Sequence, residues 1–221
     1  MKIWHASDTH NRPSIVKTVA DVECDVIVLT GDILANKGRV DPARGGTGRI
    51  EPHLERKYQD QWFRKVAKKW AVAFAGRPVV YCPGNHDFID IGPWLAHYGH
   101  TNLHVISAEI PCVEVLGKRF AGFREIPWID GEWMGETHDL QEPVDRAFAC
   151  DPDVLVTHGP PAGILAGQFG YGNAALTSAL TWRHHMIVAH LFGHEHSDCG
   201  VTTEMGILFS NAAATGRLIE I

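Results

Sequence analysis

Five short apolar runs in this sequence each end in a cluster of polar residues. The runs begin at Ile3, Val26, Val79, Val154 and Ile187, and the clusters that follow them are rich in Asp, Asn and His. Short runs of branched residues bounded by Gly or Pro are typical of buried strands. Open α/β sheets bind ligands on the loops just past the carboxyl ends of their strands. The pattern therefore predicts an α/β fold with a polar site at these strand ends.

Four helices are predicted between and after these strands, at residues 13–22, 54–74, 142–149 and 173–184. The longest has apolar residues at every fourth position, which we interpret as one helix face: Tyr58, Trp62, Val66, Trp70 and Phe74. Residues 112–116 and 119–123 flank Gly117-Lys118 and predict a hairpin. Residues 207–210 and 218–221 predict late strands. The middle and end of the chain should therefore be more antiparallel than its beginning.

The composition is that of a globular protein, and we expect a single domain over residues 1–221. The net charge of −6 excludes a generally basic surface for nucleic acid. The first residues do not resemble a signal peptide, and no apolar run approaches the ~18 residues of a membrane span. The five cysteines have no C-x-x-C spacing, so we expect buried free thiols. These features predict a cytoplasmic protein with no membrane partner.

The polar clusters are rich in potential metal ligands. A single D-x-H or G-N-H-D motif is more often a turn, because Asn, Asp and Gly favour turns. All five clusters, each after an apolar strand, are hard to explain as turns. Imidazole and carboxylate groups without thiolates suit Mn, Fe, Zn, Ni or Co. The candidate ligands are Asp8, His10, Asp32, Asn85, His158, His194 and His196.

As a set, these motifs resemble those of the calcineurin-like metallophosphoesterases. The matching segments are Asp8-Thr9-His10, Gly31-Asp32, Gly84-Asn85-His86-Asp87, His158-Gly159 and Gly193-His194-Glu195-His196. The resemblance implies a four-layer α-β-β-α sandwich with two mixed β-sheets and a metal site at the carboxyl ends of the strands. Residues 157–165 are also similar to the MPPED phosphodiesterases, which favours a phosphodiesterase.

The resemblance also implies a mechanism that uses two divalent metal ions, with Mn²⁺ the first choice. One metal would be held by Asp8, His10, Asp32 and His196, and the other by Asp32, Asn85, His158 and His194, so Asp32 is the bridge. A hydroxide that bridges the metals would attack phosphorus in line with the leaving alkoxide. His86 would not be a ligand. As the catalytic acid, it would bind the phosphoryl oxygen and protonate the leaving group.

The sequence departs from the family pattern at two positions. An acidic residue often lies three positions after the bridging Asp and pairs with the catalytic His, but that position is Ala35 here. Asn36, Asp87 or a water could replace it. The arginine that follows G-N-H-[DE] in the Ser/Thr phosphatases is replaced by Phe88, which argues against a phosphoprotein phosphatase.

Several functions remain open at this point. The leading hypothesis is a phosphodiesterase for small nucleotide-like or organic substrates. Residues 37–77 hold eleven basic and four acidic residues, a net charge of +7 that leaves −13 for the rest of the chain, so a nuclease is an alternative. A phosphomonoesterase and a non-catalytic scaffold on the same fold are further alternatives. The substrate-binding residues and the oligomeric state are unknown.

Other residues carry competing interpretations. In segment 37–77, Arg64, Lys65, Lys68 and Lys69 are read as the solvated face of a helix that packs away from the site. The arginines of the loop before that helix could instead hold substrate phosphates. Trp94, Trp128 and Trp133 are read as core residues, with nucleobase stacking as the alternative. We expect Asp87 to fix its turn and Glu195 to point away from the metals. Nine histidines outside the motifs receive no role.

Overall fold

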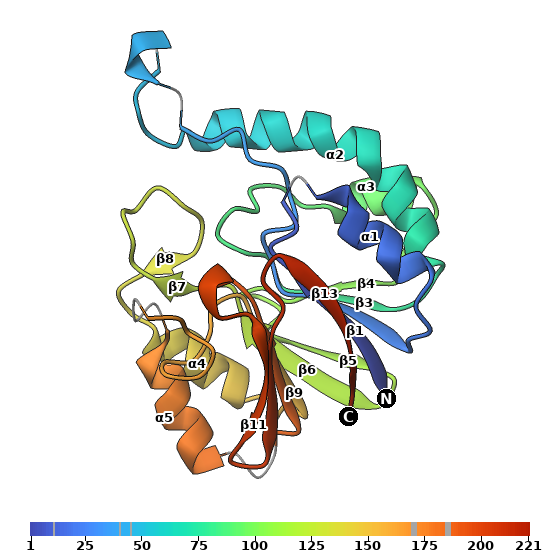
Figure 1. The fold of residues 1–221 in the computed structure, drawn as a ribbon, viewed down its shortest axis with the longest axis vertical. Coiled ribbons are helices and arrows are strands. Elements are labelled where there is room, and N and C mark those ends of the chain that lie inside the picture. Colours follow the sequence, from blue (N-terminus) through green and yellow to red (C-terminus); the bar gives the residue numbers. More distant parts are fainter. Residues whose placement is uncertain (11, 40, 45, 169–171, 184–186) are drawn as a thin grey trace.

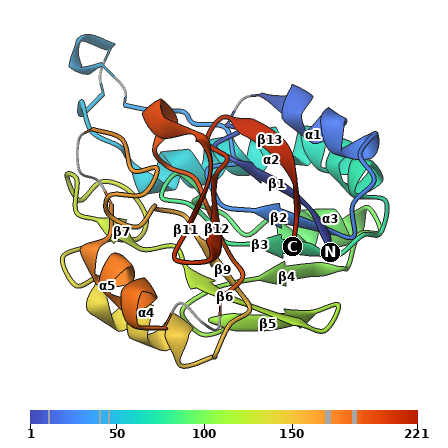
Figure 2. The same cartoon turned by 60° about the horizontal axis from the view of Figure 1, so that its bottom comes forward.

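In the computed structural model, two mixed sheets pack against each other (Figures 1 and 2). The structure describes residues 1–221 except 11, 40, 45, 169–171 and 184–186. The first sheet has the order β13 (Thr215–Glu220), β1 (Lys2–Ser7), β2 (Val26–Leu29), β3 (Val79–Tyr81), β4 (Leu103–Val105). Its strands are parallel except β13, which pairs antiparallel with β1. The carboxyl ends of β1, β2 and β3 therefore lie at one edge.

The second sheet has a parallel centre and antiparallel edges. Its order is β11 (Gly200–Glu204), β12 (Ile207–Asn211), β10 (Ala189–Phe192), β9 (Val154–Thr157), β6 (Lys118–Phe123), β5 (Cys112–Val115). The pairs β6–β9, β9–β10 and β10–β12 are parallel. The β5–β6 pair is the predicted hairpin, and β11–β12 is antiparallel as well. A separate small sheet joins β7 (Ile126–Pro127) to β8 (Glu136–Thr137).

Helices cover the outer face of each sheet. The first sheet is covered by α1 (Pro13–Ala20), α2 (Pro52–Phe74) and α3 (Gly92–His97), and the second by α4 (Gln141–Phe148) and α5 (Ala174–Arg183) (Figure 1). Short 3-10 turns lie at Pro42–Arg44 and His196–Asp198. Three buried apolar clusters lie between helices and first sheet, between the sheets, and between second sheet and helices. The predicted α-β-β-α sandwich is therefore confirmed.

The predicted helices and late strands are present with shifted ends. The last strand begins at Thr215, three residues before its predicted start, because it pairs with β1 over that strand's whole length. The predicted end of the last helix at residue 184 lies outside the described residues. Helix α3 and strands β4 and β11 were not predicted. Each is six residues or fewer, too short for a clear period in the sequence.

The buried face of α2 differs from the predicted one. Tyr58, Trp62 and Val66 are only partly buried, whereas Gln59, Phe63 and Ala67 are buried. A strict four-residue repeat rotates by about 40° at each step around a helix of 3.6 residues per turn. The apolar repeat therefore drifts off one face, and the true buried face includes the polar side chains of Glu55 and Gln59.

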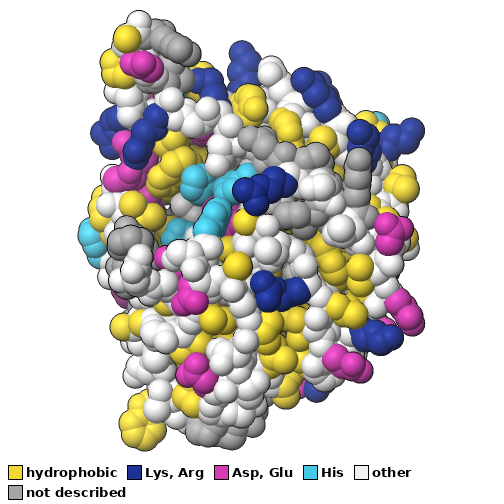
Figure 3. Space-filling view, in the orientation of Figure 1, with side chains coloured by type: hydrophobic (Ala, Val, Ile, Leu, Met, Phe, Trp, Pro, Cys, Tyr) yellow, Lys and Arg dark blue, Asp and Glu magenta, His cyan; other side chains and the backbone are white. Residues whose placement is uncertain are grey.

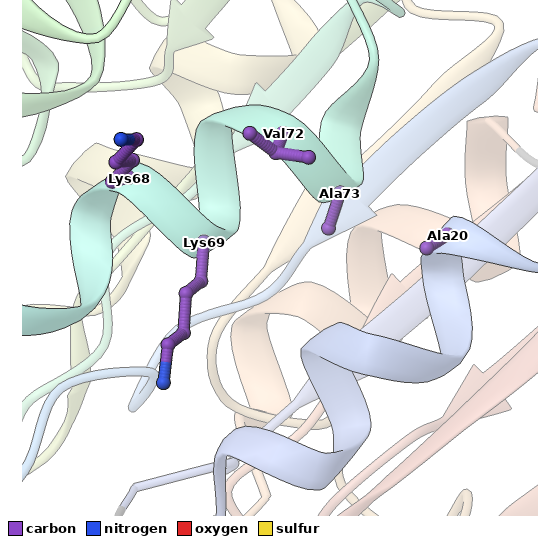
Figure 4. A pocket seen from close by; sticks show the side chains of 5 residues that line it. All are labelled: Ala20, Lys68, Lys69, Val72 and Ala73. Carbon is purple, nitrogen blue, oxygen red and sulfur yellow. The ribbon is translucent and has the colours of Figure 1, made fainter.

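A shallow apolar groove lies between α1 and α2, lined by Ala20, Lys68, Lys69, Val72 and Ala73 (Figure 4). None of these residues is a predicted site residue. None of the described helices is both long and apolar enough to cross a membrane. The cysteines are free, as predicted, but only Cys82 is buried, so the expectation of buried thiols is wrong for the other four.

Two buried histidines lie on strands within the sandwich. His5 on β1 contacts Thr30 and Ser210 through its two ring nitrogens, at 3.0 and 2.9 Å, and so links the two sheets. His190 on β10 contacts the Thr157 hydroxyl at 2.8 Å. Burial lowers the pKa of each to about 3. Both rings are therefore neutral in the folded protein.

We expect these two histidines to make the fold sensitive to mild acid. Below pH 6.5 the unfolded chain binds protons at both positions, while the folded chain does so only near pH 3. Stability should therefore fall as the pH is lowered from about 6.5, by up to about 1.4 kcal/mol per pH unit for each histidine. When the free energy of unfolding is measured with urea between pH 6.5 and 5, His190→Leu should reduce its dependence on pH by the equivalent of about one bound proton. An unchanged slope would contradict the neutral, buried state.

Candidate metal centre

The structure brings all seven predicted ligands to one edge of the sandwich. They follow five strands of the two sheets: Asp8 and His10 after β1, Asp32 after β2, Asn85 after β3, His158 after β9, and His194 and His196 after β10. In the space-filling view, histidine side chains gather in one hollow on this edge (Figure 3). Ile129, His194, Glu195 and His196 line a cavity of about 280 Å³ there.

Asp8 is buried and accepts hydrogen bonds from both sides of the site. Its Oδ2 accepts from the Ser7 hydroxyl at 2.6 Å and from the His194 backbone N–H at 2.8 Å. Its Oδ1 accepts from Nε2 of His196 at 3.0 Å. Burial would raise the pKa of Asp8, but the hydrogen bond from His196 and the charge of His158 bring it below its usual value. Asp8 is therefore a buried carboxylate.

Asp32 occupies the centre of the site. Its Oδ1 accepts from the His86 backbone N–H at 2.8 Å and lies 3.5 Å from Nε2 of His158. Its Oδ2 lies 3.9 Å from Nε2 of both His10 and His86. Burial opposes ionisation, yet the surrounding histidines hold the pKa of Asp32 well below its usual range. Its two oxygens thus face different sets of partners, as a bridging ligand requires.

His158 crosses from the second sheet to the first. Its Nδ1–H donates to the Thr30 carbonyl at 2.7 Å, which leaves Nε2 facing Oδ1 of Asn85 at 2.8 Å. Burial lowers its pKa, but Asp32 outweighs this effect and raises the pKa to about 9. The His194 ring lies 5.0 Å from that of His158, and burial lowers the pKa of His194 to about 4. The hydrogen bond to Thr30 orients Nε2 of His158, as is usual for metal-ligating histidines.

The donor atoms converge closely enough to hold cations. Atoms within 4.8 Å of one another form three groups: Asp8, His10 and His196; His10, Asp32 and His86; and Asp8, Asp32 and His158. His194 joins none of these groups, and His86, predicted not to be a ligand, joins one. No described Lys or Arg forms an ion pair with Asp8 or Asp32. Among the described residues, the ion-pair partners of these two buried carboxylates are histidines, and such a site fits bound cations, because a buried charge needs a partner.

The backbone around the ligands adopts an uncommon conformation. Asp8, His10, Asp32 and His194 have φ of 52°, 41°, 53° and 68°, in the left-handed region. Residues other than Gly seldom adopt it, and such positions cluster at functional sites. A Cβ atom at Gly84 would collide with the Asp32 carboxylate. The Gly of G-N-H-D is therefore required where β3 approaches Asp32.

A model of the calcineurin-like phosphoesterase family matches residues 1–198 of the chain. This match spans all five ligand-bearing loops. The chain belongs to the calcineurin-like phosphoesterase family. Among curated proteins, a search finds no match. Membership suggests a metal-dependent phosphoesterase, and the remaining features of the site show how this member departs from the family pattern.

Asn36 contacts His86, whereas Ala35 has no polar side chain with which to do so. Its Nδ2 lies 2.8 Å from Nδ1 of His86 and 3.3 Å from Nδ1 of His10. Burial lowers the pKa of His86, while Asp32 partly offsets this effect. Of the two side chains considered from the sequence, Asn36 and Asp87, Asn36 is the one in hydrogen-bond contact with the ring. An amide therefore contacts the His86 ring in this chain, where the family pattern described above has a carboxylate.

Asp87 has a structural role, as the turn interpretation expected. Its buried carboxylate accepts hydrogen bonds from the backbone N–H groups of Asp32, Ile33, Leu34 and Gly84, at 2.7 to 3.1 Å. It thereby joins the loop after β2 to the loop after β3. Burial and the nearby charge of Asp32 raise its pKa. Glu195 accepts hydrogen bonds from the Ser197 N–H and hydroxyl, and it also lines the cavity beside His194 and His196.

Sequence reasoning missed the contribution of α2. Gln59 donates to the His86 carbonyl at 2.6 Å and accepts from the Phe88 N–H at 2.8 Å. Glu55 accepts from the N–H groups of Lys37 and Gly38. The prediction that this helix packs away from the site is therefore wrong. An amide and a carboxylate within an apolar repeat are the signal that could have revealed these contacts.

A further missed residue is Arg12, which is exposed close to His196. The hydrogen bond with Asp8 raises the pKa of His196, although partial burial and the positive charge of Arg12 oppose this. Arg39 and Arg49, from the loop before α2, both contact Glu132 instead. Arg12 is thus a candidate to contact a substrate phosphate, while Arg39 and Arg49 already have acidic partners.

We expect Asp87→Ala to destabilise the protein strongly. The change would leave several backbone N–H groups without an acceptor, at ~1–3 kcal/mol for each group that stays buried. Urea unfolding should show a loss of at least ~3 kcal/mol. Asp90 offers a matched control, because it is exposed and, within the described part of the chain, accepts a hydrogen bond from the Gly92 N–H alone. Equal losses for Asp87→Ala and Asp90→Ala would contradict the structural role of Asp87.

Proposed function

We propose that this protein is a phosphodiesterase that uses two divalent metal ions and cleaves small nucleotide-like or other organic phosphodiesters. The observation that carries the proposal is the central, buried Asp32, with candidate ligands on both sides and a partly exposed His86 beside it. The family membership supports a phosphoesterase. The choice of a diester rests on further features of this chain.

Asp8, His10, Asp32 and His196 would hold one metal ion, and Asp32, Asn85, His158 and His194 the other. When bound, such ions act as Lewis acids, and they lower the pKa of a bound water molecule to near neutrality. The nitrogen and oxygen donors suit Mn²⁺, our first choice, and also Fe, Zn, Ni or Co. The hydrogen bond from His158 to the Thr30 carbonyl orients the His158 ring, and the bond from the His194 backbone N–H orients the Asp8 carboxylate.

His86 would bind a phosphoryl oxygen and protonate the leaving group. Its side chain is 23% exposed, and Nε2 faces the site at 3.9 Å from Asp32. The Asn36 amide can hold the ring in either protonation state. Its nitrogen donates to Nδ1 of neutral His86. After rotation, its oxygen accepts from Nδ1–H of the imidazolium, which is the form that can give up a proton at Nε2.

The distribution of charged groups supports a diester over a monoester. A phosphomonoester is a dianion near neutral pH and benefits from additional cations. Arg39 and Arg49 are already paired with acidic residues, and Arg12 is an exposed cation close to His196 among the described residues. Arg64, Lys65, Lys68 and Lys69 are exposed on α2, as the solvated-face interpretation predicts. The resemblance of residues 157–165 to the MPPED phosphodiesterases points the same way.

A colorimetric diester assay tests this proposal. Protein loaded with Mn²⁺ should hydrolyse bis(p-nitrophenyl) phosphate faster than p-nitrophenyl phosphate, and a chelator should abolish both reactions. A screen of mono-, di- and cyclic nucleotide phosphates would then define the substrate class. The proposal fails if protein shown to bind metal has no turnover with any divalent ion. Hydrolysis of DNA or RNA that weakens steeply with salt would favour the nuclease instead.

We expect His86→Ala to reduce kcat without removing metal. General acid catalysis contributes ~10²–10⁴-fold, and this loss should be largest for substrates with poor leaving groups. Metal content, measured by atomic emission on dialysed protein, should match that of the wild-type protein. Asp32→Ala is the contrast, because it should reduce both metal content and activity. If His86→Ala loses metal and Asp32→Ala does not, the assigned roles are wrong.

A further inference from the structure

The loop between β7 and β8 places a tryptophan on His86. The centroids of the Trp133 and His86 rings are 3.8 Å apart, and the ring planes are inclined by 31°. This close, tilted contact covers one side of the imidazole, while Asn36 contacts its Nδ1. Trp133 was read from the sequence as a core residue. Its partial burial and its partner give it a different role.

The backbone of this loop is held by one carboxylate. Glu136 accepts hydrogen bonds from four backbone N–H groups, those of Ile129, Asp130, Gly131 and Trp133, at 2.6 to 3.0 Å. The next residue, Met134, donates its N–H to the Asn85 carbonyl at 3.0 Å. Trp133 is therefore attached through its neighbours to a candidate metal ligand, so its ring has a defined place above His86.

A second carboxylate fastens the loop to the segment before α2. Glu132 accepts from Nε of Arg39 at 2.9 Å, from Nε of Arg49 at 2.8 Å and from the Ile50 N–H at 3.0 Å. Only 9% of the Glu132 side chain is exposed. Arg39 also pairs with Asp130. The two loops lie side by side at the rim of the site (Figure 1).

We propose that Trp133 is a positioning residue for His86 and that Glu132 holds Trp133 in place. The proposal rests on the proposed function, in which His86 protonates the leaving oxygen. A ring held by one hydrogen bond can still tilt about that bond, and the stacked indole prevents this tilt. Since proton transfer depends on the direction of Nε2, loss of the indole should impair protonation of the leaving group more than the binding of substrate.

The leaving group supplies the diagnostic measurement. p-Nitrophenolate departs without a proton, whereas phenolate or an alkoxide needs one. Trp133→Leu should therefore lower kcat for a phenyl or alkyl diester about tenfold to a hundredfold. The kcat for bis(p-nitrophenyl) phosphate should change less than about threefold, and KM and metal content should stay near the wild-type values. Glu132→Gln should reproduce this pattern more weakly, without altering the indole or the imidazole.

Trp128 provides a matched control on the same loop. It is 49% exposed and stacks on His138 rather than on His86. Trp128→Leu should leave both classes of substrate unaffected. In a His86→Ala background, Trp133→Leu should cause no further loss. Equal losses for phenyl and p-nitrophenyl leaving groups, in a wild-type protein that is active, would overturn the positioning role and leave the proposed function intact.

A measurement that needs no activity tests the contact itself. The factor by which Trp133→Leu changes the unfolding equilibrium constant should be smaller in the His86→Ala background than in the wild-type protein. Equal factors would show that the rings do not interact and would overturn the proposal. If the factors differ but the metal-loaded wild-type protein cleaves no phosphoester, the proposed function fails, and the positioning role of Trp133 fails with it.

Discussion

Two buried carboxylates, Asp8 and Asp32, are the constraint around which this molecule is arranged. A buried charge must be paired or solvated by hydrogen bonds, and here the partners come from both sheets. The His194 N–H and His196 reach Asp8 from the second sheet, and His158 reaches Asp32 across the same gap. The edge where the sheets meet is therefore a polar junction that packing alone would not produce, and it is suited to bound cations.

The acidic residues beside this junction have different tasks because their surroundings differ. Asp32 faces histidines and remains a carboxylate available to the site. Asp87, two residues beyond Asn85, accepts hydrogen bonds from backbone N–H groups of two loops. Glu132 and Glu136 act farther out, where they shape the loop that carries Trp133. Carboxylates thus hold the site itself, the two loops beside it and the loop that carries Trp133.

The ligand set could be predicted from the sequence because each ligand directly follows an apolar strand, so local order in the chain maps onto one edge of the sheets. Asn36 could only be offered as one of several replacements at the Ala35 position. Gln59 and Trp133 reach His86 from α2 and from a loop far along the chain, and the sequence does not show that His86 is their partner. Arg39 and Arg49 looked like phosphate ligands because their acidic partner lies more than eighty residues away.

The sequence by itself determined the alternation of strands and helices, the family and the identity of the candidate ligands. Each of these features depends on residues that are close together in the sequence, such as a hydrophobic period or a motif at the end of a strand. The tertiary structure alone decided which residues orient His86, which cations remain free and how the two sheets share their buried charges. Each of these depends on side chains that are distant in sequence and become neighbours only when both sheets are packed together.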